Sequence, residues 1–167
     1  MAEDVPTTDP LSDPLFLQVD HVGIAVPDLD EAVALYGRTF GLRLLHEETN
    51  EEQGVREAML GVGAPSATRD ELESGTRLQL LAPLTPESTI ATFIGRNGPG
   101  LQQLAYRVAD VEAAAETLRS RGLRLLYDAP RRGTAGSRVN FVHPKDAGGV
   151  LVELVELPSP DTGAHAV

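Results

Sequence analysis

Residues 20–45 read DHVGIAVPDLDEAVALYGRTFGLRLL, and residues 102–126 read QQLAYRVADVEAAAETLRSRGLRLL. Each stretch opens with two polar residues, continues as an alternating strand, and passes through an aspartate into an amphipathic helix. Each also ends in the same residues, Gly-Leu-Arg-Leu-Leu. A pattern repeated over this length predicts two copies of one structural unit.

Both predicted helices have recognisable ends. Asp28 and Asp110 stand where an N-cap belongs, and Glu31 completes a capping-box pattern in the first copy. Gly41 and Gly122 are placed to end the helices in left-handed turns. The predicted apolar stripes are Val33, Tyr36 and Phe40 in the first helix, and Val111, Ala115 and Leu118 in the second.

Three further strands are predicted after each helix. They are expected at residues 42–47, 55–62 and 77–81 in the first copy, and at residues 123–127, 138–142 and 150–156 in the second. Each copy is therefore a βαβββ module, and the fold class is α+β. Two tandem modules can curl their sheets around a shared cleft. The alternative is a pair of similar ferredoxin-like domains without a shared site.

The remaining segments set the domain limits. Residues 61–75 are expected to form a loop with a short charged stretch, residues 86–96 a linking helix, and residues 97–100 a hinge. The first module with its linking helix spans residues 15–96, and the second spans residues 97–158. Acidic, proline-rich residues 1–14 and residues 159–167 are predicted to be flexible tails.

Composition excludes several classes of function. The formal net charge is −11, which argues against nucleic acid and anionic membranes as partners. The chain has no cysteine, so disulfides, thiolate metal sites and a cysteine nucleophile are excluded. No apolar run reaches the roughly 20 residues that span a bilayer, and the N-terminus does not resemble a secretory signal. We therefore expect a cytoplasmic protein.

Superposing the two copies brings four polar residues into register. His21 falls on Gln103 in the opening strand, and Gln79 falls on Glu153 in the closing strand. Gln79 and Glu153 interrupt otherwise apolar strands, where an unpaired polar group would cost several kcal/mol. A divalent cation bound by His21, Gln79, Gln103 and Glu153 would satisfy all four. One imidazole and three oxygens suit Co²⁺, Mn²⁺ or Mg²⁺ better than structural Zn²⁺.

Each of these residues also has a simpler explanation. His21 alone would be a core histidine with satisfied hydrogen bonds, and the two glutamines could bond the backbone. Glu153 could pair with Arg77 on another strand. The repeat is what favours the metal site over these alternatives. His46, His143 and His165 are weaker candidates.

Several segments together resemble the methylmalonyl-CoA epimerases of the vicinal-oxygen-chelate superfamily, which also holds glyoxalase I and the extradiol dioxygenases. The segments are DHVGIAVPDLDEAV (20–33), HEETNEEQGVREAML (46–60), LQLLAPLTPESTIATFI (78–94), LQQLAYRV (101–108) and LYDAPRRGTAGSRVNFVHPKDAGGVLVELVE (126–156). They follow one another in the expected order and spacing. The resemblance implies a typically homodimeric enzyme that interconverts the two C2 epimers of methylmalonyl-CoA.

The resemblance also implies roles for individual residues. The metal ligands would be His21, Gln79, Gln103 and Glu153. The chain departs from the family here, because most members have two histidines where it has Gln102 and Gln103. Either Gln103 binds through its amide oxygen, or water takes its place. The family's catalytic base falls on Glu57, which alone would be read as a surface glutamate.

Epimerisation needs an acid or base on each side of the carbon that loses and regains its proton. Glu57 from one module and Glu153 from the other could supply them. Coenzyme A is anionic, so we expect Arg131, Arg132 and Lys145, in a glycine-rich basic stretch, to contact its phosphates. An ordinary solvated loop would explain the same residues.

Three other functions are compatible with this scaffold. A glyoxalase I-like lyase also moves a proton beside a metal-bound oxygen, and hemithioacetal turnover would identify it. An extradiol dioxygenase needs two histidines and a carboxylate, which Gln103 disfavours. A metal-free binding module would bind ligand without turnover. Methylmalonyl-CoA and ethylmalonyl-CoA differ by one methylene, and the sequence does not choose between them.

Overall fold

The computed structural model describes residues 14–160, so the predicted tails lie almost wholly outside it. Its elements, in chain order, are β1 (Gln18–Ala25), α1 (Leu29–Phe40), β2 (Arg43–Asn50), β3 (Val55–Gly61), α2 (Arg69–Ser74), β4 (Arg77–Pro83), α3 (Thr89–Asn97), β5 (Gly100–Arg107), α4 (Val111–Ser120), β6 (Arg131–Arg132), η1 (Thr134–Gly136), β7 (Arg138–Val142), η2 (Pro144–Asp146) and β8 (Val152–Glu156). Within these residues, no helix has the length and apolar character needed to cross a bilayer.

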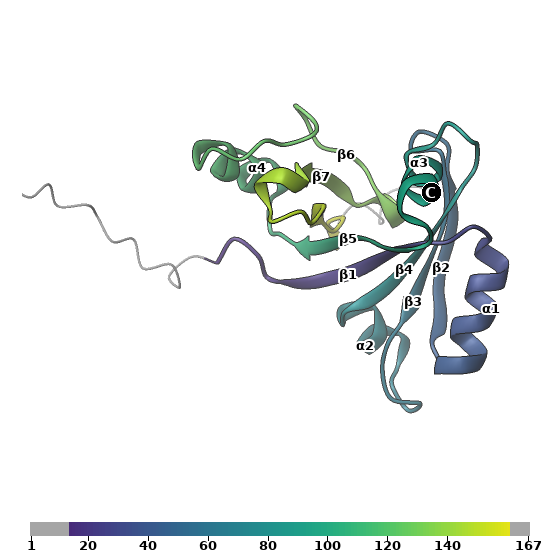
Figure 1. The fold of residues 1–167 in the computed structure, drawn as a ribbon. Helices are drawn as coiled ribbons and strands as arrows, with labels where there is room; N and C mark the ends of the chain where they lie inside the picture. The colour runs from purple at the N-terminus through teal and green to yellow at the C-terminus, as the bar shows by residue number, and fades with distance from the viewer. Residues whose placement is uncertain (1–13, 161–167) are drawn as a thin grey trace, which may run out of the picture.

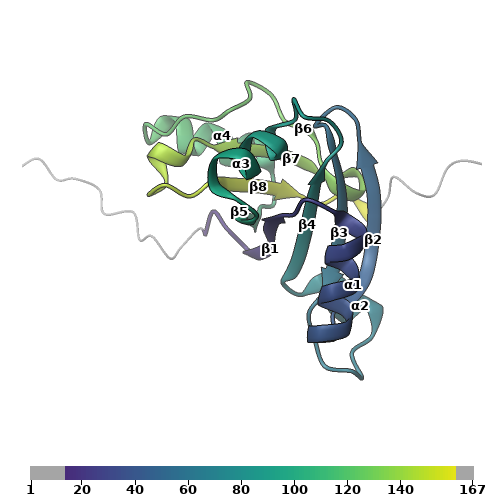
Figure 2. The same ribbon diagram turned by 45° about the vertical axis from the view of Figure 1, so that its right-hand side comes forward.

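All the strands belong to one eight-stranded sheet with the order β2-β3-β4-β1-β5-β8-β7-β6. Strands β1 and β5 pair antiparallel at its centre, and each has a parallel neighbour on its other side, β4 and β8 respectively. Counted outward from the centre, equivalent strands of the two modules therefore follow in the same order, β1-β4-β3-β2 in one half and β5-β8-β7-β6 in the other. Figures 1 and 2 show the two halves turning toward each other. The predicted α+β fold of two modules in one curled sheet is confirmed.

Helices α1 and α4 each cover the outer face of one half. As predicted, Asp28 caps α1 by accepting the Glu31 amide, and Gly41 ends it with a φ of 70°. In α4, Asp110 caps the helix and its predicted stripe is buried. In α1 the predicted stripe is partly wrong, because Phe40 is 63% exposed and Leu29 and Ala32 are the buried residues.

The inner face carries two further apolar clusters. Ile90 and Phe93 of α3 pack onto Val55 and Leu81, at one end of the first half. In the second half the inner cluster is Ala105, Val139, Phe141 and Val155, with Tyr127 and Leu151 against it. The predicted linking helix thus exists, at Thr89–Asn97, and its first two residues line a cavity that residues of both halves share.

The strand predicted at residues 123–127 is wrong. Only Leu125 forms a bridge, to Val142. The buried side chain of Asn140 bonds both the amide and the carbonyl of Tyr127, at 3.2 and 3.0 Å. These side-chain bonds satisfy backbone groups that a ladder would otherwise pair. The short strand β6 takes the edge position instead.

The segment predicted as a loop at residues 61–75 contains helix α2. Thr68 and Glu71 form a complete capping box, and Leu72 of this helix is buried. The Thr-x-x-Glu spacing that signals such a cap was present in the sequence. The helix is short, which is why no apolar periodicity revealed it.

Replacing Leu80 by Ala should destabilise the protein by about 2 to 5 kcal/mol, the usual cost of a cavity in a packed core. Leu80 is fully buried on β4 within the cluster under α1. Leu101→Ala is the matched control, because Leu101 is 71% exposed. Chemical denaturation of both variants measures the difference. Equal stabilities would contradict the assignment of this core.

Candidate functional site

Five neighbouring strands each place one polar side chain on the inner face of the sheet. In strand order these residues are Glu57 on β3, Gln79 on β4, His21 on β1, Gln103 on β5 and Glu153 on β8. All five are buried. They form a polar row across the centre of the sheet, and the joint between the two halves runs through it.

Four members of this row converge on one point. The Nε2 atom of Gln103 lies 2.6 Å from Oε2 of Glu153 and 3.0 Å from Oε1 of Gln79. The Nε2 atom of His21 lies 3.1 Å from the same Glu153 oxygen and 3.4 Å from Gln103 Nε2. The structure thus brings together the four residues that the sequence suggested as ligands.

A glycine on β1 makes room for Gln103. Gly23 and Gln103 are direct partners in the β1–β5 pairing. A Cβ atom on Gly23 would lie only 2.4 Å from Cγ of Gln103. The absence of a side chain at residue 23 therefore allows the glutamine to reach the centre of the row.

The donor set suits a divalent cation. Within residues 14–160, no three His, Cys, Asp or Glu side chains are arranged to hold a metal by themselves. Two of the four converging residues are glutamines, so a cation here would depend on amide oxygens as well. Glutamine offers an amide oxygen, and a half-turn of the Gln103 amide would direct that oxygen at its neighbours. One imidazole nitrogen, one carboxylate and two amide oxygens are ligands that Co²⁺, Mn²⁺ and Mg²⁺ accept.

Glu57 lies next to these four residues, at the first-module end of the row. Its Oε2 accepts a 3.0 Å hydrogen bond from Gln79, and its Oε1 accepts a 2.7 Å bond from the Thr134 hydroxyl. Burial raises the pKa of Glu57 to about 7, with the charges of Glu48 and Glu153 adding to it against the Thr134 bond. A carboxyl poised near neutrality can both take and give a proton.

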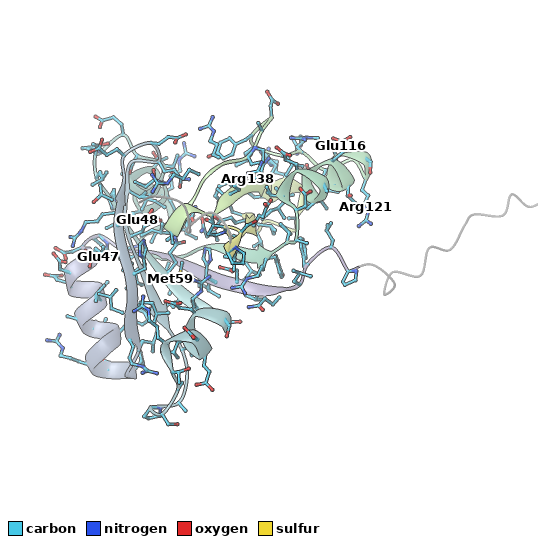
Figure 3. All side chains as sticks on the ribbon, turned by 180° about the vertical axis from the view of Figure 1, so that it is seen from behind. Glu47, Glu48, Met59, Glu116, Arg121 and Arg138 are labelled. Atoms are coloured by element: carbon cyan, nitrogen blue, oxygen red, sulfur yellow. The ribbon has the colours of Figure 1, made fainter. Side chains whose placement is uncertain are left out.

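Two residues that the sequence did not single out, Glu48 and Thr134, lie beside Glu57. Glu48 lies opposite Glu57 on β2 and is labelled in Figure 3. It accepts hydrogen bonds from His46 and from the amide of Ala135. Thr134 bonds Gln79 as well as Glu57, and so joins the η1 turn of the second module to the first.

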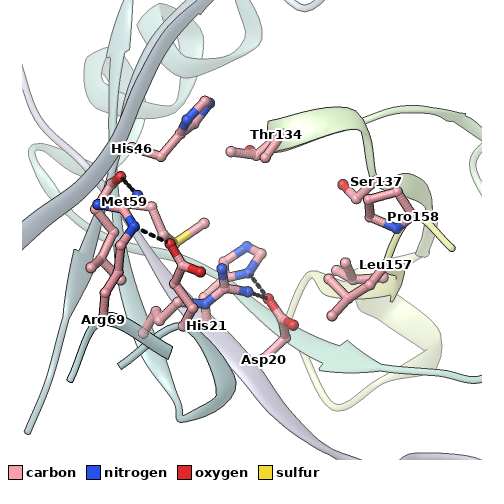
Figure 4. A pocket seen from close by; sticks show the side chains of 14 residues that line it. Asp20, His21, His46, Met59, Arg69, Thr134, Ser137, Leu157 and Pro158 are labelled. Carbon is pink, nitrogen blue, oxygen red and sulfur yellow. Dashed lines mark hydrogen bonds and ion pairs between the residues drawn. The ribbon is translucent and has the colours of Figure 1, made fainter. Parts of the chain in front are cut away.

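Asp20 is the second group that sequence reasoning missed. It is buried beside His21 and accepts a 2.8 Å bond from His21 Nδ1 (Figure 4). It also pairs with Arg77, which excludes the alternative that Arg77 pairs with Glu153. Burial alone would lower the pKa of His21, but the charge of Glu153 and the bond to Asp20 raise it to about 9. A cation would have to displace the Nε2 proton.

Two cavities flank the polar row, and Thr134 borders both. The cavity in Figure 4 has a volume of about 290 Å³ and contains His21, His46 and Met59. The other measures about 260 Å³ and contains Glu57, Gln79 and Gln103. Apolar side chains from the two inner clusters wall this second cavity; they are Val55, Leu81, Ile90, Tyr127, Phe141 and Leu151.

The three basic residues suggested for coenzyme A do not lie together. Arg131 lines the second cavity, with its guanidinium 3.9 Å above the Tyr127 ring. Arg132 is exposed beside it, and its carbonyl accepts a bond from Gln53. Lys145 lies in η2, past the opposite end of β7, and lines neither of these cavities.

Comparison with known proteins identifies the family. The family model for the Glyoxalase/Bleomycin resistance protein/Dioxygenase superfamily matches residues 20–141. The ethylmalonyl-CoA/methylmalonyl-CoA epimerase of Cereibacter sphaeroides is 35% identical over 142 residues, which are 84% of this chain and 98% of that protein. The crystal structure of methylmalonyl-CoA epimerase from Mycobacterium tuberculosis is 51% identical, covers 93% of this chain and 97% of that one, and has a TM-score of 0.80.

A second solved structure is described as methylmalonyl-CoA epimerase in complex with methylmalonyl-CoA and NH4+. It is 46% identical, covers 86% of this chain and 96% of that one, and has a TM-score of 0.78. These matches extend over both modules and the joint between them. The chain therefore belongs to the Glyoxalase/Bleomycin resistance protein/Dioxygenase superfamily and, within it, to the methylmalonyl-CoA epimerase family.

Proposed function

We propose that this protein interconverts the two C2 epimers of methylmalonyl-CoA with the help of a divalent cation. The observation that carries the proposal is the convergence of His21, Gln79, Gln103 and Glu153 beside a buried glutamate, Glu57, whose pKa lies near neutrality. Relatives that match nearly the whole chain bear the same activity in their names.

The reaction explains why the row has a carboxylate at each end. The C2 proton lies between a thioester and a carboxylate, and it must leave from one face and return on the other. Glu57 on β3 and Glu153 on β8 stand on opposite sides of the central strands. Glu57 takes or gives the proton on one face, and Glu153 serves the other face directly or through water.

The proposed cation ligands are His21, Gln79, Gln103 and Glu153. When bound, a divalent ion supplies positive charge that stabilises the negative charge developing on the thioester oxygen. Co²⁺ is the ion we propose for assays in vitro, with Mn²⁺ and Mg²⁺ as alternatives. Thr134 and Gln79 meanwhile hold Glu57 in place through their hydrogen bonds.

The second cavity is the proposed place for the acyl group and the pantetheine arm of the substrate. It holds Glu57, Gln79 and Gln103, its walls are apolar, and Arg131 lies among the residues that line it. A pantetheine arm can pack against such walls while a guanidinium binds a phosphate. Arg132 is exposed and near enough in sequence to assist, whereas Lys145 could act only on a more distant phosphate. We also propose a cytoplasmic homodimer, as the family resemblance implies.

The first prediction concerns the reaction and its cation. Methylmalonyl-CoA in D₂O should gain deuterium at C2 and epimerise when the protein is present with Co²⁺, because the acid/base groups exchange protons with solvent. Chelation followed by dialysis should slow both processes at least about tenfold, and added Co²⁺ should restore them. Proton NMR follows both. Full activity after chelation would exclude the cation, and turnover of glutathione hemithioacetal alone would identify a lyase.

The second prediction separates the activity of Glu57 from its effect on stability. Glu57→Gln should lower kcat by about 10²- to 10⁴-fold, the usual worth of a general acid or base. The folded-state pKa of about 7 is above the ordinary 4.5, so wild-type stability falls as pH rises between these values. Glu57→Gln does not titrate and so lacks this loss. Its stability should therefore fall less than that of wild type between pH 4 and pH 8.

Thermal denaturation of the metal-free proteins at both pH values measures the second effect. Glu116→Gln is the control, because Glu116 is an exposed residue of α4 and should change neither quantity. An active Glu57→Gln variant would remove Glu57 from the mechanism. A variant that loses stability at pH 8 would contradict the pKa assigned to Glu57.

The third prediction concerns recognition of coenzyme A. Arg131→Glu should raise KM for methylmalonyl-CoA on the order of tenfold, because a charged hydrogen bond to phosphate becomes a repulsion. Arg121→Glu carries the same change at an exposed position at the end of α4, and should leave KM unaltered. Lys145→Glu tests the more distant contact. Steady-state kinetics with equal KM for wild type and Arg131→Glu would refute this placement.

A further inference from the structure

Asp20 and His21 are consecutive residues of β1, yet both side chains are buried. In a regular strand, consecutive side chains point to opposite faces of the sheet. The pairing register shifts at this point, because Val19 pairs with Tyr106 while His21 pairs with Ala105. Asp20 is thus an extra residue without a partner on β5. Irregularities of this kind redirect side chains, and they are frequent beside active sites.

The Asp20 carboxylate is held on three sides. Its Oδ1 accepts the 2.8 Å bond from His21 Nδ1 and a 2.6 Å bond from Arg77. Its Oδ2 accepts a 2.9 Å bond from Nε of Arg107. Arg77 lies on β4 and Arg107 on β5, so the two arginines come from the strands on either side of β1. The carboxylate therefore has a fixed position between the two halves of the sheet.

The surroundings also fix the charge of Asp20. The guanidinium groups of Arg77 and Arg107 each donate to one of its two oxygens, and a carboxylate held between two cations is ionised. An ionised carboxylate accepts hydrogen bonds and donates none. The nitrogen of His21 that faces Asp20 must then carry a proton. The other nitrogen, Nε2, faces Glu153 and Gln103.

We propose that Asp20 is a positioning residue that orients His21, keeps a proton on its Nδ1, and so presents Nε2 to the cation. This inference rests on the cation site proposed above. A carboxylate behind a metal-binding histidine orients the ring and raises its basicity, and removing it typically weakens metal binding by about 10- to 100-fold. The alternative is that Asp20 only neutralises the two arginines at the joint between the halves.

The wild-type protein provides the first test. The chain has four histidines, so ¹⁵N-histidine NMR of the metal-free protein gives few signals, and a His21→Asn variant assigns the one of interest. We expect a proton on Nδ1 of His21 that exchanges slowly with solvent. The partly exposed His46 is the internal reference for fast exchange. An Nδ1 without a proton, or with a proton exchanging as fast as that of His46, would overturn the proposal.

The second test compares two Asp→Asn variants. Asp20→Asn should bind Co²⁺ about 10- to 100-fold more weakly than wild type, measured by calorimetric titration. Asp30→Asn is the matched control, because Asp30 also pairs with an arginine, Arg56, but is exposed on α1, which covers the face of the sheet opposite the polar row. It should keep wild-type affinity. Unfolding temperatures are recorded for both variants.

The outcomes separate the two explanations. A purely structural role lowers the unfolding temperature of Asp20→Asn and leaves the Co²⁺ affinity of the folded protein unchanged, which overturns the proposal. If this variant does not fold, the wild-type NMR result decides. Wild-type protein that binds no Co²⁺ refutes the cation site and with it the role of Asp20 toward a metal. Epimerase activity enters neither test, so failure of the proposed reaction is distinguished from failure of this inference.

Discussion

The burial of five polar side chains on the inner face of the sheet is the constraint on which the site depends. A buried polar group without a partner costs several kcal/mol, so each member of the row must be satisfied by its neighbours or by a ligand. The bonds from Gln103 to Glu153 and Gln79, and from Gln79 to Glu57, meet that need in the protein alone. The row therefore holds together as one network, and displacing one side chain leaves others without partners.

Duplication is what makes such a row possible. The central β1–β5 pair joins equivalent strands of the two modules, so residues at matching positions face one another across the joint. The irregularity at Asp20 has a counterpart in β5, because Gly23 pairs with Gln103 while Ile24 pairs with Leu101, which leaves Gln102 as the extra residue. Both opening dipeptides of the repeat thus place two adjacent side chains near the site.

The repeat made much of this arrangement predictable. It relates His21 to Gln103 and Gln79 to Glu153 from the sequence alone, and the family resemblance adds Glu57. The position of Asp20 beside the His21 ring was hidden, because regular alternation places it on the face opposite His21. Thr134 was equally hidden, since the η1 turn holds Ala135 at a φ of 53° and has no counterpart in the first module. Such features depend on tertiary contacts that local patterns do not encode.

The glutamine at position 103 also has a physical consequence of its own. A glutamine amide carries two N–H donors and an acceptor oxygen, whereas a neutral imidazole has one N–H donor and one acceptor nitrogen. The Gln103 amide nitrogen donates to Glu153 and Gln79, two acceptors that would otherwise lie side by side unpaired. Rotation of the same amide would direct its oxygen at that point instead. One side chain can therefore serve the row as a donor or as an oxygen ligand, and Gly23, which leaves room against its Cγ, is what permits a side chain of that shape at the centre.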